Sequence, residues 1–184
     1  RIREALVAEI NSSDFKSINQ KIAEKIDQKI KNEKIEIENS VYLLARHYSL
    51  GAIEVNPKRV YLANFEAAQE SLKSYANEES YDFLIVALQT ANHFKLEIPI
   101  EFYETIGEVC RITSKIKDAI EYFNKAISMS NDRQEKARIL GLISNTYLSG
   151  WEIEIAWKTI KKSFIELGRP LPESLLMSIL SVLY

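Results

Sequence analysis

Cysteine, proline, glycine and histidine are all scarce in this sequence of 184 residues, which has one cysteine, four prolines, five glycines and two histidines. The single Cys110 excludes an internal disulfide and is typical of a reducing compartment, so we expect a cytoplasmic protein. So few glycines and prolines leave room only for short turns, which favours helices over a fold of many strands. His47 and His93 have no histidine or cysteine at ligand spacing, so neither a metal nor another cofactor is predicted.

The sequence also lacks a large excess of charge of either sign, because its formal net charge is −2. This gives no electrostatic reason to expect nucleic acid or an anionic membrane as a partner. Residues 16–34 are rich in lysine, but acidic residues are threaded through the run, which favours a solvated helix face over a binding patch. No apolar stretch approaches the roughly 20 residues that span a bilayer.

What the sequence does have is helical periodicity throughout. The first clear stripe is Ile18, Ile22, Ile26 and Ile30, with Ser13 or Asp14 as its N-cap. We expect two further helices over residues 37–50, ended by Gly51, and 57–76, opened by Asn56-Pro57. Four more should begin near residue 79, near residue 99, at Ser114 as N-cap, and at Ser130-Asn131-Asp132. The last two are expected over residues 151–167, ended by Gly168, and from Pro172 onward. Together with a short stretch at the N-terminus this predicts an all-α fold of about ten helices.

A repeated pattern of large and small residues lies in the second half of the chain. Gly107 and Ala119 are 12 residues apart, and Phe123 follows. Two antiparallel helices approach closely only where the facing side chains are small, so Gly107 and Ala119 are expected at a helix crossing, with Phe123 filling the gap toward the next hairpin. The full set of matching positions is Tyr103, Ile106, Gly107, Ala119, Phe123 and Ala126, then Leu140, Ile143, Ser144, Tyr147, Ala156 and Ile160, with a weaker copy in Ala67, Ala68, Ser71, Ser80, Leu84 and Ala87.

This pattern resembles the tetratricopeptide (TPR) repeat, whose period is about 34 residues. The resemblance implies a right-handed array of antiparallel helical hairpins, a TPR-like α–α superhelix. The expected organisation is a helical segment over residues 1–56, three hairpins over 57–170 and the start of a further, truncated helix over 171–184. That last segment is too apolar to be a solubilising cap, so it is expected to contact either a following repeat or a second chain, which would be self-association.

Short motifs in the chain are also similar to those of the STAND class of multidomain signalling ATPases. The stretch 1–6 resembles an R-I-x-x-A helix that ends the ATPase module, and the residues that carry the rest of the resemblance are Ile22-Ala23-Glu24, Leu44 to Gly51 with its A-x-H-Y core, Tyr61 to Ala68, Ser80 to Leu84, and Glu166 to Pro172 as an L-G-x-x-L-P turn. The resemblance implies that residues 1–56 are the tail of an upstream module, that a P-loop ATPase precedes this region and that a histidine kinase or cyclase follows it. The chain itself has no G-x-x-x-x-G-K-[ST] motif.

The first helix of each TPR hairpin lines a concave surface, so we expect a partner-binding groove on these helices. Glu101, Glu104 and Glu108 share one helix face. This face is interpreted as a solvated surface, as one wall of the groove or, least of all, as a pair of acid/base catalysts. The groove residues predicted are Phe65, Gln69, Leu72, Glu101, Glu104, Glu108, Arg111, Asn145 and Leu148. No catalytic residue is assigned: Cys110 is expected as a buried thiol, and one of Trp151 and Trp157 is expected in the core.

Three functions stay open on these observations. The first is a non-catalytic helical scaffold or sensor arm within a multidomain signal-transduction protein, whose partner is a protein, a peptide or a neighbouring domain. The second is a free-standing TPR adaptor that binds a peptide in its concave groove. The third is an α-helical enzyme, which would need a pocket with convergent polar groups that the sequence does not indicate.

Overall fold

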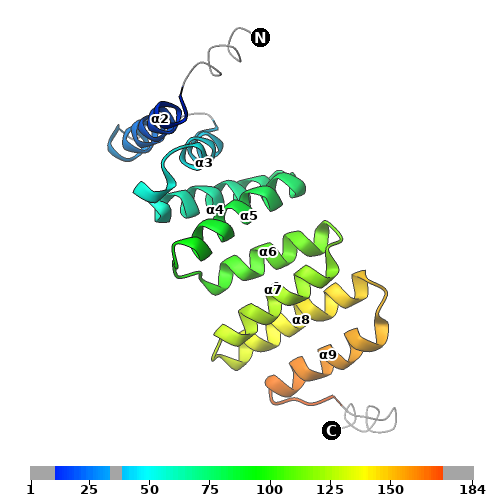
Figure 1. Cartoon of the computed structure of the whole chain (residues 1–184). Coiled ribbons are helices and arrows are strands. Elements are labelled where there is room, and N and C mark those ends of the chain that lie inside the picture. The colour runs from blue at the N-terminus through cyan, green and yellow to red at the C-terminus, as the bar shows by residue number, and fades with distance from the viewer. Residues whose placement is uncertain (1–10, 34–38, 172–184) are drawn as a thin grey trace. The chain divides into compact units, whose positions relative to one another are not determined.

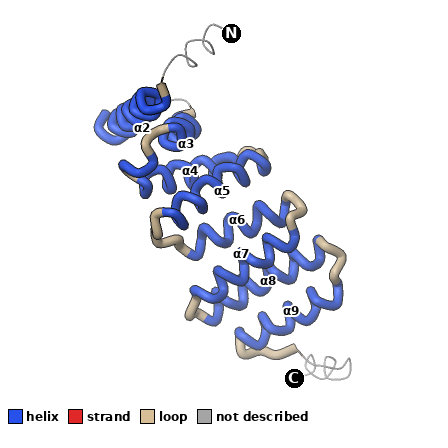
Figure 2. Tube along the Cα trace, in the orientation of Figure 1, coloured by secondary structure: helices blue, strands red, loops and turns tan. Residues whose placement is uncertain are grey.

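The computed structural model describes residues 11–33 and 39–171, and in these ranges every regular element is helical (Figures 1 and 2). The eight α-helices of this part of the chain pack as sequential antiparallel pairs. The helices expected at residues 1–6 and from Pro172 lie outside the described residues. Contacts divide the chain into two compact units, residues 1–98 and 99–184, whereas the sequence placed boundaries at 56 and 170.

In the described residues of the first unit there are four helices and one short 3-10 turn. They are α2 (Ser12–Glu33), α3 (Ser40–Leu50), η1 (Ile53–Val55), α4 (Pro57–Lys73) and α5 (Asn77–His93). Asn56 caps α4 as predicted, because its Oδ1 accepts the backbone N–H of Arg59 at 3.1 Å and Pro57 takes the first helical position. The core of this unit draws on three helices: Ala23 of α2, Leu44 and Tyr48 of α3, and Val60 and Ala63 of α4 are all buried together.

Two expectations for α2 were wrong. The N-cap is Asn11, whose Oδ1 accepts the backbone N–H of Asp14 at 2.8 Å, because the helix begins one residue earlier than Ser13. Only half of the isoleucine stripe packs against the core: Ile26 does so, but Ile18 and Ile22 are 45% and 38% exposed. The face that meets α3 is centred on Ala23, a small residue that allows close approach.

Up to residue 171, the second unit has four helices, α6 (Ile100–Ile112), α7 (Ile116–Met129), α8 (Arg133–Ser149) and α9 (Ile153–Glu166), each packed against the next. Asp132 caps α8 as the sequence indicates, since its carboxylate accepts the backbone N–H of Glu135 at 3.0 Å. Phe102, Ile106, Phe123 and Ile139 have no exposed surface and form the largest part of the interior.

The same three-residue turn joins α4 to α5, α6 to α7 and α8 to α9. Its middle residue is left-handed each time: Tyr75, Ser114 and Trp151 have φ of 59°, 61° and 61°. The next backbone N–H then reaches the carbonyl five residues back, at 2.9 Å for Ala76, 2.7 Å for Lys115 and 2.9 Å for Glu152. Ser114 is therefore the left-handed turn residue and not the N-cap that the sequence suggested, which is Lys115.

Small residues face each other where the paired helices cross. A side chain at Gly107 would meet the ring of Phe123, since an added Cβ would lie 2.8 Å from Phe123 Cε1. The expected crossing at Gly107 is thus confirmed, with the correction that Phe123 packs on Gly107 inside its own hairpin. In the other two hairpins a serine hydroxyl donates across the crossing to an alanine carbonyl at 2.9 Å, Ser80 to Ala68 and Ser144 to Ala156.

Gly51 and the two tryptophans differ from expectation. Gly51 follows α3 as predicted, but its φ is −83°; α2 comes close at this point, and an added Cβ would lie 3.2 Å from Gln20 Cα. Neither tryptophan packs in the core: Trp151 is 87% exposed at the tip of a turn, and Trp157 on α9 is 55% exposed. Gly168 follows α9, near where the sequence predicted its end, and is left-handed, with φ of 72°.

Candidate functional site

The candidate site is a group of polar side chains on α6 and α8, which we call the α6–α8 face and define by Glu104, Glu108, Arg111, Arg138 and Asn145. Glu104, Glu108 and Arg111 follow one another at spacings of four and three residues, so they share one face of α6. Arg138 and Asn145 are two turns apart on one face of α8. The buried residues of α6, such as Ile106, occupy its other side.

An ion pair joins the two helices of this face. The guanidinium of Arg138 donates two hydrogen bonds to the carboxylate of Glu104, from Nη1 to Oε2 at 2.8 Å and from Nη2 to Oε1 at 2.5 Å. The hydrogen bonds to Glu104 raise the pKa of Arg138. The Arg138 side chain is 53% exposed and that of Glu104 only 19%, so the pair fixes the spacing of α6 and α8 while leaving the cation open to solvent.

A second pair lies within α6 itself. Arg111 donates from Nε to Glu108 Oε2 at 2.8 Å, and its Nη2 donates to Glu108 Oε1. The hydrogen bonds that Arg111 donates to Glu108 are the main cause that raises the pKa of Arg111. Two of the three glutamates predicted for this helix face therefore have arginine partners, and the face is a mixed, nearly neutral polar surface and not an acidic wall.

The nine predicted groove residues are distributed over both units. Phe65 is only 8% exposed and stacks on Tyr61, with 6.2 Å between the ring centroids, so its side chain belongs to the core. Gln69 and Leu72 are half-buried in the first unit. The other six lie on α6 and α8, where Glu101 and Asn145 are exposed and Leu148 is 50% exposed. Arg138 was missed, although an arginine one TPR period (34 residues) after Glu104 was a readable signal.

A buried ionic cluster in the first unit was also missed. Arg59 of α4 donates to Asp27 of α2 through two nitrogens, Nε to Oδ2 at 2.9 Å and Nη2 to Oδ1 at 3.0 Å. Tyr48 of α3 donates to the same Oδ2 at 3.1 Å, and Lys31 does so at 3.2 Å. The side chains of Asp27 and Arg59 are 11% and 14% exposed, so this is an almost desolvated, bidentate pair.

The protonation states in this cluster follow from its contacts. Burial alone would raise the pKa of Asp27, but the hydrogen bonds and charge of Arg59 outweigh it and hold that pKa below its ordinary value. Burial, with the adjacent Asp27 carboxylate, raises the pKa of Tyr48 to about 12. Because Tyr48 of α3 and Arg59 of α4 both donate to Asp27 of α2, we assign the cluster to holding α2, α3 and α4 together.

Groups with catalytic or metal-binding potential are dispersed in the described residues. His47 Nδ1 lies 2.8 Å from Asn19 Oδ1, between α3 and α2, and His93 is the last residue of α5. Cys110 is fully buried as predicted, and burial raises the pKa of its thiol to about 12. Across residues 11–33 and 39–171, no three histidine, cysteine, aspartate or glutamate side chains are grouped to hold a metal ion.

Comparison with known proteins returns no family model, no curated protein and no solved structure that matches the chain. Among the described helices, none has the length and apolarity to cross a membrane.

Proposed function

We propose that this chain is a non-catalytic helical-repeat module that binds a protein segment across the α6–α8 face. The observation that carries the proposal is the threefold recurrence of one hairpin: a three-residue turn with a left-handed middle residue, and a pair of small residues 12 positions apart at the crossing. The turn residues are 39 and 37 residues apart. Spacings just above the 34 of a TPR, together with matched small residues, support a TPR-like repeat.

Repeat arrays use an extended surface, formed by equivalent helices, to bind their partners. The α6–α8 face has the features of such a surface. It is built from the first helix of two successive hairpins, and the Glu104–Arg138 pair holds those helices at fixed spacing. Next to Arg138, Gly141 has no atom within 4 Å of an added Cβ, so the backbone of α8 is open to an approaching chain.

The chemistry of the face favours a polar peptide segment. Arg138 retains solvent-exposed donors while it pairs with Glu104, and Asn145 adds an exposed amide that both donates and accepts. Leu148, which is 50% exposed, supplies an apolar contact at one end. Arginines neutralise Glu104 and Glu108, so the α6–α8 face has little net charge. It therefore repels neither an acidic nor a basic segment strongly.

The wider context that fits this proposal best is a sensor or scaffold arm of a multidomain signalling protein of the STAND class, as the short sequence motifs imply. A free-standing adaptor would use the same face. The two differ in what lies on the face, which is a neighbouring domain in the first case and a separate protein in the second. An enzyme of unrecognised type is the third candidate, and no described group of side chains favours it.

The test compares two asparagine substitutions in the full chain used as bait. Asn145→Arg places a large cation on the α6–α8 face, whereas Asn124→Arg makes the same change at an exposed position of α7. We expect one set of proteins to be captured quantitatively by the unmodified chain and by Asn124→Arg, and lost with Asn145→Arg. Equal capture by both variants, with equal helicity in circular dichroism, would remove the α6–α8 face as the binding surface.

A nucleotide titration separates the module from an enzyme. Because the chain has no phosphate-binding loop, we expect no heat of binding when ATP with magnesium is added to it in a calorimeter. Saturable binding of ATP by this chain would exclude a non-catalytic module.

A further inference from the structure

A row of lysines and a row of isoleucines run side by side along the exposed side of α2, which we call the α2 face. Residues four apart lie above one another on a helix, and residues three apart are neighbours, so the two rows are adjacent. The α2 face consists of Lys21, Lys25 and Lys29, which are all exposed, and of Ile18, Ile22 and Ile26, each of which comes three residues before one of these lysines.

The two rows border a shallow groove. It has a volume of about 460 Å³, its lining is mostly apolar, and the residues that line it are Lys21, Ile22, Lys25, Ile26 and Lys29. Ala23, on the other side of α2, belongs to the core of the first unit. The described helices of this unit therefore leave the groove open to solvent.

The fold separates charges that alternate in the sequence of α2. Asp27 turns inward to the ionic cluster, and Glu24 accepts a hydrogen bond from Gln20 Nε2 at 2.7 Å. Asp14, at the start of the helix, accepts one from Asn11 Nδ2 at 2.6 Å. Within the described part of the chain, no carboxylate forms an ion pair with a lysine of the α2 face. The α2 face is therefore basic, although the mixed sequence by itself favours a solvated surface.

The lysine row is unfavourable for α2 on its own. Lys21 and Lys25 are a like-charge pair at a spacing of four residues, and so are Lys25 and Lys29, which destabilises a helix slightly at each step. Carboxylates placed opposite the row would replace this repulsion by attraction. The row therefore favours a partner whose acidic side chains recur at the spacing of a helix.

We propose that the α2 face binds an acidic amphipathic helix of another protein, with its apolar side chains in the groove and its carboxylates on the lysine row. A helical partner suits the groove, because rows of residues four apart on one helix pack into the grooves between such rows on another. The inference adds a surface in the first unit to the α6–α8 face of the second, and the two are tested separately.

Two other anionic partners fit the α2 face less well. A helix that lies on a membrane has a broad apolar side, often with tryptophan or phenylalanine, whereas this face exposes only Ile18 and Ile22 beside its lysines. Surfaces that bind nucleic acid combine lysine with arginine and stacking aromatic residues. The sequence of α2 contains no arginine, tryptophan or tyrosine.

The test is the binding of a labelled synthetic peptide to the full chain, followed by fluorescence anisotropy. The peptide is an amphipathic helix of about 18 residues, with leucines on one face and glutamates on both sides of them. A scrambled peptide of the same composition is the control. We expect saturable binding at least about tenfold tighter than that of the scrambled peptide, and a loss of about tenfold as salt rises from about 50 to about 300 mM.

Two matched pairs of variants locate the binding. Lys25→Glu reverses the charge at the centre of the row, and Lys58→Glu makes the same change at an exposed position in the first turn of α4. Ile22→Gln removes an apolar contact from the groove, and Val55→Gln does so at a residue of η1 that is 63% exposed. We expect losses of about tenfold with Lys25→Glu and about fivefold with Ile22→Gln, and less than about twofold with either control.

Four results would overturn the proposal. The first is no saturable binding up to about 1 mM peptide, and the second is an equal effect of a variant and its control. The third is binding that Asn145→Arg abolishes, which would place the peptide on the α6–α8 face. The fourth is a Lys25→Glu-sensitive association with vesicles of phosphatidylserine and phosphatidylcholine that is tighter than the association with the peptide, which would assign the α2 face to a membrane.

Discussion

The ring of Phe123 occupies the space in which a side chain at position 107 would begin, with 2.8 Å between Phe123 Cε1 and the position of a Cβ on Gly107. Both residues are fully buried, one on each helix of the α6–α7 hairpin. The hairpin therefore depends on the absence of a side chain at one position as much as on the presence of a ring at the other.

Replacing Gly107 by alanine tests this relationship. Overpacking a filled interior costs about 1–3 kcal/mol, and the helix propensity of alanine returns roughly 1 kcal/mol, so we expect a net loss in urea unfolding. Gly141→Ala is the matched control: it lies inside a helix with nothing within 4 Å of its Cβ, and should gain about 0.5–1 kcal/mol. A stabilising Gly107→Ala would contradict the close approach.

The Asp27–Arg59 pair should make the stability of the first unit depend on pH. The pKa of Asp27 is lower in the folded chain than its ordinary value of 3.8. Its contribution is therefore fully present above the ordinary carboxyl pKa and is lost as the pH falls through the lower folded value. We expect Asp27→Asn to reduce the free energy of unfolding by about 2–3 kcal/mol at pH 7, and the gap to the unmodified chain to narrow below pH 4.

The control for this prediction is Asp82→Asn, which removes an exposed carboxylate from α5 of the same unit. It should change the unfolding free energy by less than about 0.5 kcal/mol at any pH. If Asp27→Asn behaved in the same way, the cluster would have no role in holding α2 to α4.

The left-handed residue of the hairpin turns should favour glycine. A non-glycine residue pays about 1–2 kcal/mol in this conformation, so Ser114→Gly should stabilise the chain by about 0.5–1 kcal/mol after the greater entropy of glycine in the unfolded chain is subtracted. Gly168→Ala should do the opposite, because Gly168 already has φ of 72°. We expect the midpoint of thermal unfolding to rise in Ser114→Gly and to fall in Gly168→Ala.

The thiol of Cys110 should be inert in the native protein. Burial, with a smaller effect of Asp118, raises its pKa to about 12, so almost no thiolate is present at pH 8. We expect no reaction with a disulfide reagent until denaturant is added. In Ser128→Cys, the added thiol lies on the exposed side of α7 and should react within the mixing period; rapid reaction of both thiols would show that the α6–α7 interior opens.

Local signals were sufficient to predict most of the fold. Asn56-Pro57 and Asp132 mark helix starts by their own side chains, and Gly107 with Ala119 marks a crossing, because these features act within a few residues or one hairpin. Ser114 was misread because its hydroxyl suits an N-cap, whereas the turn places it in the left-handed region and leaves the cap to Lys115.

The polar contacts were harder to predict, since they join positions far apart in the sequence. Asp27 is 21 residues from Tyr48 and 32 from Arg59, and it stands in a lysine-rich helix where its charge is expected to face solvent. Only the packing of α2 against α3 and α4 turns it inward. Glu104 and Arg138 are similar: each suits an exposed helix position, and the pair follows from the packing of α6 next to α8.

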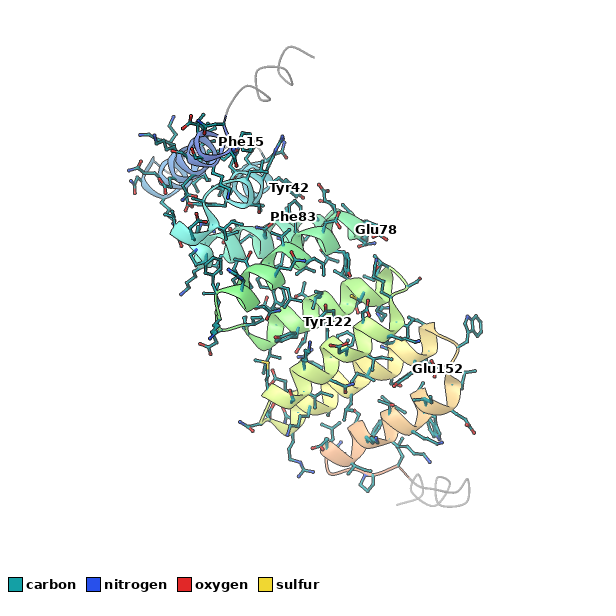
Figure 3. All side chains as sticks on the ribbon, in the orientation of Figure 1. Phe15, Tyr42, Glu78, Phe83, Tyr122 and Glu152 are labelled. Atoms are coloured by element: carbon teal, nitrogen blue, oxygen red, sulfur yellow. The ribbon has the colours of Figure 1, made fainter. Side chains whose placement is uncertain are left out.

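Tyr42 and Phe83 illustrate a contact of the same kind between aromatic side chains. Their ring centroids are 5.9 Å apart, which joins α3 to α5 across 41 residues of sequence, and both side chains are labelled in Figure 3. From the sequence, each looks like one more half-buried aromatic residue on an amphipathic helix. Their pairing follows only from the packing of both helices against α4.

The serine hydrogen bonds at the helix crossings run from the second helix to the first in one hairpin and from the first to the second in another. Ser80 donates from the second helix of its hairpin to Ala68 on the first, whereas Ser144 donates from the first helix to Ala156 on the second, both at 2.9 Å. A serine hydroxyl on either helix can therefore join the two helices of a hairpin. For protein engineering, we expect that the serine and the alanine of a crossing can be exchanged between the two helices of a hairpin. Hairpins with either arrangement could then be combined in one array without redesign of the crossing.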